Sequence, residues 1–207
     1  MRNIIWDFDG TLFDTDGAIV SSFLSVLREK YGIYENENKI RRFIKIDTKE
    51  CAESLSSEYG LNKALLLSEA REEYDRLGIE AQRPISGASS VCEKVIESGG
   101  INALVTHRDK ASVERFLDYY DFYKYFACLI TCNDNFELKP SPQSFLHVIN
   151  FLSLEKALTC GVGDRELDVG AANGAQIASY FYCSIGSKSI SAKYNITELS
   201  ELESVIA

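Results

Sequence analysis

The chain alternates short apolar runs with amphipathic segments of helical spacing. Five continuously apolar runs have the length of strands, namely residues 3–6, 101–105, 127–131, 158–163 and 177–183. Continuous hydrophobicity is typical of strands that are covered on both faces, as in a parallel sheet. Because helical patterns separate these runs, the sequence predicts an α/β fold with a doubly wound, mostly parallel sheet.

Several helix ends are marked by the residue types that favour them. The amphipathic segment after residue 87 ends at Gly99 and Gly100. Asp109 has the position of an N-cap for the helix that follows it, and Ser141 with Pro142 predicts an N-cap and first turn for the next helix. These signals place helices between the predicted strands, as a doubly wound sheet requires.

The stretch from residue 16 to residue 83 contains no strand pattern. Four segments within it have helical spacing, namely 18–32, 39–46, 48–60 and 62–78. A connection of this length inside a compact domain normally has structure of its own. We therefore expect a small all-helical domain, residues 16–83, inserted after the first strand of an α/β core domain that comprises residues 1–15 and 84–207.

The composition limits the partners and the compartment. A net charge of -9 and a pI of about 4.8 argue against nucleic acid or an anionic membrane as a partner. The chain begins on a strand pattern, so we expect no signal peptide, and no apolar run approaches the ~20 residues of a membrane span. We therefore expect a cytoplasmic protein, with its six cysteines reduced and mostly small core residues.

Polar residues follow four of the predicted strands. Asp7 comes directly after the first, Thr106 after the second and Asp164 after the fourth, while Lys139 follows the third by a short loop. In an open α/β sheet, ligands bind outside the carboxyl ends of the strands. Four separate elements therefore bring polar side chains to one edge of the sheet, where we expect a functional site.

These residues carry a family resemblance. The motif "DFDGT" at residues 7–11, the hydroxyl of Thr106 in "LVTHR", Lys139 in "LKPSP", and Asp164 and Asp168 in "GVGDRELD" resemble, in order, the four motifs of the haloacid dehalogenase-like superfamily of aspartate-nucleophile hydrolases. The resemblance covers the whole chain. It implies a Rossmann-like core, and it likens the helical insertion to the family's helical cap.

The resemblance also implies roles for the acids. Asp7 would be the nucleophile that forms an aspartyl-phosphate. Asp7 and Asp164 would bind Mg²⁺ through their side chains and Asp9 through its backbone carbonyl, because a hard cation offsets the repulsion between a carboxylate and a phosphate. Asp168 would hold metal-bound water or Lys139 without binding the metal itself. Asp9 would serve as the general acid and base.

The same resemblance implies the phosphate-binding groups. Thr106 and Lys139 would bind phosphate oxygens and assist catalysis. Gly10 would keep the backbone close enough for nearby amides to face the phosphate. His107, next to Thr106, is a further candidate for substrate contact. Arg108 and Arg165 flank the motif residues, and the pattern gives them no role.

Other motif assignments fail on spacing. "DFDGTLFDTDG" has its glycine at the fourth position, where an EF-hand needs one at the sixth. "GVGDRE" lacks the third glycine of a dinucleotide-binding fingerprint. The match to the four family motifs is therefore the interpretation that the spacing supports.

The resemblance predicts an enzyme and leaves its subclass open. An acid at Asp9 favours phosphate esters, so we expect a Mg²⁺-dependent phosphatase for a small phosphorylated metabolite, similar to phosphoglycolate phosphatases, acting as a monomer or homodimer. A sugar phosphomutase resembling β-phosphoglucomutase is the alternative among enzymes, and a catalytically weak binding or regulatory protein is the alternative of another class. Specificity would reside in the cap, where Arg41, Arg42 and Lys45 are the cations to consider.

Overall fold

The computed structural model describes residues 1–46, 48–184 and 186–206. The chain divides into two compact units, an α/β unit of Met1–Phe13 with Pro84–Ala207 and a helical unit of Asp14–Arg83. Each unit has its own hydrophobic core. None of the described helices combines the length and the apolar composition that a membrane span requires.

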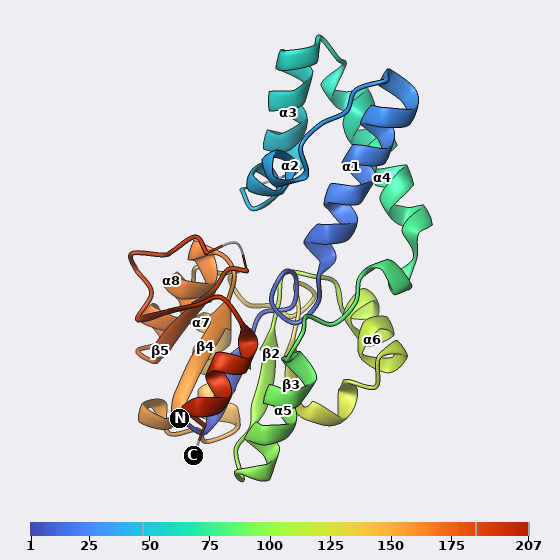
Figure 1. The fold of residues 1–207 in the computed structure, drawn as a ribbon. Helices are drawn as coiled ribbons and strands as arrows, with labels where there is room; N and C mark the ends of the chain where they lie inside the picture. The colour runs from blue at the N-terminus through green and yellow to red at the C-terminus, as the bar shows by residue number, and fades with distance from the viewer. Residues whose placement is uncertain (47, 185, 207) are drawn as a thin grey trace. The chain divides into compact units, whose positions relative to one another are not determined.

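A parallel six-stranded sheet forms the centre of the α/β unit (Figure 1). Its strands are β1 (Asn3–Trp6), β2 (Asn102–Val105), β3 (Phe126–Ile130), β4 (Thr159–Gly163), β5 (Ala178–Tyr182) and β6 (Tyr194–Ile196). Its helices are α5 (Ala88–Glu97), α6 (Lys110–Tyr119), α7 (Gln143–Phe151) and α8 (Glu166–Gly174). Single turns of 3₁₀ helix are η2 (Tyr123–Tyr125) and η3 (Lys156–Leu158), and a longer one is η4 (Leu199–Ser204). The predicted α/β class and parallel sheet are confirmed.

Helices cover both faces of the sheet. Because successive side chains of a strand point to opposite faces, β2 contributes to two layers. Ala103 and Val105 pack in one core cluster with residues of α7 and α8. On the other face the side chain of Asn102 donates to the carbonyl of Cys92 in α5, at 2.9 Å, and accepts from the indole of Trp6. The fold is therefore doubly wound, as predicted.

The strand order creates one special position at the sheet edge. The order is β3-β2-β1-β4-β5-β6, so the chain moves outward in one direction from β1 and in the other from β4. The carboxyl ends of the strands on either side of such a reversal form the crevice where open α/β sheets bind ligands. Asp7 and Asp164 directly follow these two adjacent strands.

The helical unit contains the four helices that the sequence predicts. These are α1 (Thr15–Tyr31), α2 (Glu37–Ile44), α3 (Thr48–Tyr59) and α4 (Lys63–Leu77), followed by the 3₁₀ turn η1 (Ile79–Ala81). Three N-caps use side-chain oxygens, those of Asp14, Asn36 and Asn62. Such caps satisfy amides that have no partner within the helix.

One strand was missed and one predicted N-cap was wrong. The strand β6 was not predicted, because its three residues are mostly exposed and lack an apolar run. The N-cap of α7 is Pro142 rather than Ser141, whose hydroxyl instead accepts a long 3.4 Å bond from the amide of Gln143. The predicted cap at Asp109 is confirmed, since its carboxylate accepts from the amide of Ser112 at 2.9 Å. Four of the six cysteines are buried, while Cys132 is exposed.

The close packing of β4 gives a stability prediction. A Cβ atom at Gly161 would lie 2.8 Å from both Phe145 and Ala172, two buried side chains of the α/β core. We expect Gly161→Ala to lower the free energy of unfolding by roughly 1–3 kcal/mol through overpacking. Chemical denaturation measures this, with Ser187→Ala at an exposed site as the control. Unchanged stability in Gly161→Ala would mean that α7 and α8, which carry Phe145 and Ala172, shift to accommodate the extra methyl group.

Candidate active site

Asp7 lies fully buried at the carboxyl end of β1, where its backbone amide continues the sheet by donating to Val162 in β4. The ammonium of Lys139 is 2.5 Å from Asp7 Oδ1 and also donates to the carbonyl of Val105 at 3.1 Å. Asp7 Oδ2 is buried and has no hydrogen-bond partner among the described residues. One oxygen of this carboxylate is therefore held in place, and the other is left available.

Asp168 completes the surroundings of Lys139. Its Oδ1 lies 2.5 Å from the Lys139 ammonium, and its Oδ2 accepts from the backbone amide of Arg165 at 3.0 Å, at the start of α8. The position of this carboxylate depends on Gly163, because a Cβ atom there would collide with the Asp168 side chain. The short sequence from Gly163 to Asp168 thus places an acid directly beside the end of β4.

The pKa values follow from this packing. Burial raises the pKa of the Asp168 carboxyl, and the nearby charge of Asp7 raises it further, more than Lys139 and Arg165 lower it. For Lys139, burial works against the charged form, but the two carboxylates outweigh burial and raise its pKa. Lys139 is therefore a charged ammonium at neutral pH, and it is nearly inaccessible to solvent.

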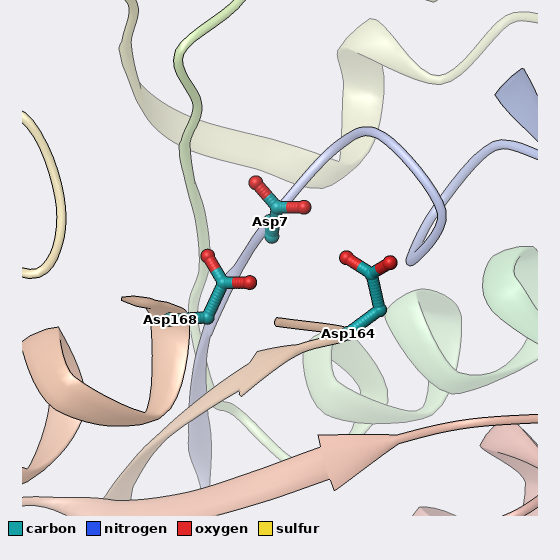
Figure 2. Close-up of side chains that lie close together, drawn as sticks. All are labelled: Asp7, Asp164 and Asp168. Carbon is teal, nitrogen blue, oxygen red and sulfur yellow. The ribbon is translucent and has the colours of Figure 1, made fainter. Parts of the chain in front are cut away.

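Asp164 brings a third buried carboxylate to the same place. Figure 2 shows Asp7, Asp164 and Asp168 side by side, and one oxygen of each lies within 4.8 Å of the others. The hydroxyl of Thr11 donates to Asp164 Oδ1 over a long 3.4 Å, and Arg165 Nε is 3.9 Å from the same oxygen. The "DFDGT" motif thus contributes its threonine to the orientation of Asp164.

This donor set fits a hard divalent cation. Three carboxylates are buried together, one buried ammonium contacts only two of them, and uncompensated buried charge is costly. The buried carboxylates of Asp7 and Asp164 offer the oxygen ligands that Mg²⁺ prefers. Asp168 is already in an ion pair with the Lys139 ammonium and accepts from the Arg165 amide, so its contribution is to hold these groups in place.

Asp9 has a partner that the sequence did not indicate. Its Oδ1 accepts from Arg108 Nη1 at 2.5 Å. The Asp9 carboxylate keeps about a third of its side chain exposed, whereas Asp7 is fully enclosed. The two acids of the first motif therefore meet different environments, one dry and one open to a substrate.

His107 supports the loop that carries Lys139 through one of its ring nitrogens. Its Nε2 accepts from the backbone amide of Lys139 at 2.8 Å. Burial lowers the pKa of His107 to about 4, and the charges of Lys139 and Arg165 add to this effect. His107 is thus a neutral acceptor that fixes the Lys139 backbone, and the role expected from sequence, substrate contact, is not available to this nitrogen.

The remaining motif residues have definite surroundings. Thr106 is buried, and its hydroxyl accepts from the amide of Arg108 at 3.0 Å, which leaves the hydroxyl proton to donate. Gly10 has a φ of 74°, a conformation that favours glycine. Its amide donates to the carbonyl of Phe13 at 2.9 Å, so Gly10 shapes the turn and does not itself offer a phosphate an amide.

Two of the three cations considered in the helical unit, Arg41 and Lys45, form ion pairs with acids of the same unit. Arg41 contacts Glu37 at 2.9 Å and Asp14 at 3.8 Å, and Lys45 contacts Asp16 at 2.7 Å. These ion pairs join cations of α2 to Asp14 and Asp16 at the start of α1. Arg42 is exposed. That any of these cations contacts a substrate stays a prediction.

Comparison with known proteins agrees with the site. The family profile of the haloacid dehalogenase-like hydrolases matches residues 4–181. The pyrophosphatase PpaX of Halalkalibacterium halodurans is 24% identical over 178 residues, which cover 82% of this chain and 77% of that protein. This chain belongs to the haloacid dehalogenase-like hydrolase family.

Two solved structures show the same fold. A Thermotoga maritima protein provisionally named beta-phosphoglucomutase has a TM-score of 0.77 at 23% identity, with 100% of both chains covered. A predicted phosphoglycolate phosphatase from Haemophilus somnus has a TM-score of 0.77 at 18% identity, covering 99% of this chain and 97% of that one. At these identities the likeness establishes the fold alone.

The bond between His107 and Lys139 predicts a pH effect on stability. Between pH 6.5 and about 4 the unfolded chain protonates this histidine and the folded chain does not, so its contribution to stability is complete above pH 6.5 and is lost as the pH falls. We expect His107→Gln, whose amide oxygen can still accept, to show a smaller loss of Tm across this range than the wild type. The control is His147→Gln at the exposed histidine of α7. Equal slopes in all three proteins would exclude the effect.

The carboxylate cluster predicts stabilisation by Mg²⁺. At a concentration of about 100 times Kd, one bound ion adds ~2.7 kcal/mol, which corresponds to a rise in Tm of roughly 5–10 °C for a chain of this size. Without metal, we expect Asp7→Asn to melt above the wild type, because it relieves the repulsion among three buried carboxylates while Lys139 keeps Asp168 as its partner. Asp164→Asn should lose most of the Mg²⁺-dependent rise, and Asp118→Asn at an exposed site should retain it. A rise that persists in Asp164→Asn would contradict the assigned site.

Proposed function

We propose that this protein is a Mg²⁺-dependent phosphatase that hydrolyses a small phosphorylated metabolite through an aspartyl-phosphate. Membership of a hydrolase family and the pyrophosphatase name of the relative described above support phosphatase chemistry. The acidic composition supports a small-molecule substrate over nucleic acid. Phosphoglycolate and pyrophosphate are the first compounds to consider.

The observation that carries this proposal is the asymmetry of Asp7. Lys139 holds one carboxylate oxygen, while the other is buried and unpartnered at the sheet edge. In the first step that oxygen would attack phosphorus, the bond from phosphorus to the leaving oxygen would break, and Asp9 would give that oxygen a proton. The products are the free leaving group and a phosphoryl group on Asp7.

The second step returns the enzyme to its starting state. Asp9, now a carboxylate, would take a proton from water, and the water oxygen would attack phosphorus. The bond from Asp7 to phosphorus breaks, inorganic phosphate leaves, and Asp7 is regenerated. The partly open position of Asp9 supports this dual role, because leaving group and water must both reach it.

The other polar groups would hold the phosphoryl oxygens. Thr106 directly follows β2, and the ammonium of Lys139 donates to the carbonyl of Val105 at the end of the same strand. Both groups are therefore at the edge of the sheet where Asp7 lies. Bound Mg²⁺, held by Asp7, Asp164 and the Asp9 carbonyl, would supply electrostatic stabilisation of the phosphoryl group. Asp168 and His107 would keep Lys139 in position from either side.

Phosphate release tests the proposal. We expect purified protein to release phosphate from at least one member of a panel of pyrophosphate, phosphoglycolate, sugar phosphates and nucleotides, and chelation of Mg²⁺ to stop it. Asp7→Asn should reduce the rate to background while preserving the fold. A rate in Asp7→Asn equal to that of the wild type would exclude Asp7 as the nucleophile. Isomerisation of a sugar phosphate without phosphate release would indicate a mutase instead.

The role of Asp9 has its own test. Asp9→Asn should lower kcat by ~100- to 10,000-fold, the usual contribution of general acid–base catalysis. Because Asp9 would offer the metal its backbone carbonyl, Mg²⁺ affinity should fall less in Asp9→Asn than in Asp164→Asn. Calorimetric titration of Mg²⁺ into both variants measures this difference. An equal loss in the two would refute the assigned ligand types.

A further inference from the structure

Arg108 is fixed beside Asp9 by several contacts from the α/β unit. Its Nη1 donates to Asp9, and its Nε donates to the hydroxyl of Ser112 at 2.7 Å. The guanidinium carbon lies 4.6 Å from the ring centre of Phe116 and 5.3 Å from that of Phe8. Only 13% of the side chain is exposed. This arginine is therefore held rigidly, at little entropic cost for binding an anion.

The position of Arg108 relates directly to the leaving group. A general acid must lie ~2.6–3.2 Å from the oxygen that it protonates. Since Asp9 Oδ1 is 2.5 Å from Arg108 Nη1, that nitrogen is within about 6 Å of the leaving oxygen when the same carboxylate oxygen serves both. The atoms attached to the leaving oxygen occupy the space between that oxygen and Arg108 Nη1. A second phosphoryl group would place its oxygens there.

Electrostatics favour an anion at this point. Guanidinium groups match phosphate and carboxylate geometry and can bind two anionic groups at once through their five donors. Arg165 adds a second partly exposed cation, 32% exposed, next to Asp164. Both arginines are on the α/β unit, so this feature does not depend on the helical unit.

We propose that Arg108 binds an anionic leaving group, so that the enzyme prefers substrates with a second charged group next to the scissile bond, pyrophosphate being the simplest. The inference rests on the proposed phosphatase function and narrows its substrate class to phosphoanhydrides and closely related dianions. Arg108 contacts the departing phosphate, while Asp9 protonates the oxygen that joins the two phosphorus atoms.

A purely positioning role for Arg108 makes the opposite prediction. If Arg108 only orients Asp9, replacing Arg108 lowers kcat/KM most for the substrates that depend most on proton transfer to the leaving oxygen. Propyl phosphate is such a substrate, because an alkoxide is a poor leaving group, whereas phosphate leaves pyrophosphate readily. If Arg108 contacts the leaving group, replacing Arg108 lowers kcat/KM more for pyrophosphate than for propyl phosphate. The ratio of the two losses therefore separates the two roles.

The experiment compares kcat/KM for pyrophosphate and propyl phosphate at constant free Mg²⁺. We expect Arg108→Gln to lower the value for pyrophosphate about 10- to 100-fold more than the value for propyl phosphate, the loss of a charge-assisted contact. Arg108→Lys should recover part of this difference. Arg115→Gln removes the same charge from an exposed site on α6 and should leave the ratio unchanged. Equal losses, or a larger loss for propyl phosphate, would overturn the inference.

A binding measurement separates this inference from the proposed function. Methylenediphosphonate and methylphosphonate are non-hydrolysable probes that differ by the second anionic group. Calorimetry should show that the wild type binds methylenediphosphonate more tightly and that Arg108→Gln loses this preference. If the wild type releases no phosphate from any substrate, the phosphatase proposal fails, yet this preference still decides the role of Arg108. A preference unchanged in Arg108→Gln would refute it.

Discussion

The site depends on one ammonium buried between two carboxylates. Lys139 contacts Asp7 and Asp168 at 2.5 Å each, so losing the lysine would leave two buried carboxylates without their partner, a change that typically costs ~3–5 kcal/mol. The three residues come from the end of β1, the loop before α7 and the first turn of α8. Their attraction fixes three distant parts of the chain at one point. It also leaves the group with excess negative charge, which is the physical reason for a cation site beside it.

The sheet topology makes this arrangement possible. Parallel strands place all their carboxyl ends on one edge, and the reversal between β1 and β4 opens that edge at Asp7 and Asp164. Glycines at the strand ends matter for the same reason, since Gly163 leaves room for Asp168 to lie over the end of β4. The fold thus determines where the carboxylates lie, and the carboxylates themselves provide the reactive groups.

Sequence patterns predicted the elements well and the pairwise contacts poorly. Five strands and the four helices of the insertion follow from apolar runs and helical spacing, which report burial directly. The pattern placed Asp7, Thr106, Lys139 and Asp164 at one edge, but it did not predict the bond between Arg108 and Asp9 or that between His107 and the Lys139 amide. Such contacts depend on side-chain directions set by tertiary packing, for which spacing carries no signal. The ion pairs of Asp14 and Asp16 escaped prediction for the same reason.

The way in which the chain leaves and re-enters the α/β unit has an evolutionary consequence. The amide of Ile85 donates to the carbonyl of Leu12 at 2.9 Å, and Phe13 pairs with Pro84, so the outgoing and returning segments are joined side by side. An insertion that begins and ends at one point costs little chain entropy however long it is, and it leaves the sheet undisturbed. The helical unit is therefore an exchangeable module, whose length and surface can diverge between relatives without altering the residues that perform the chemistry.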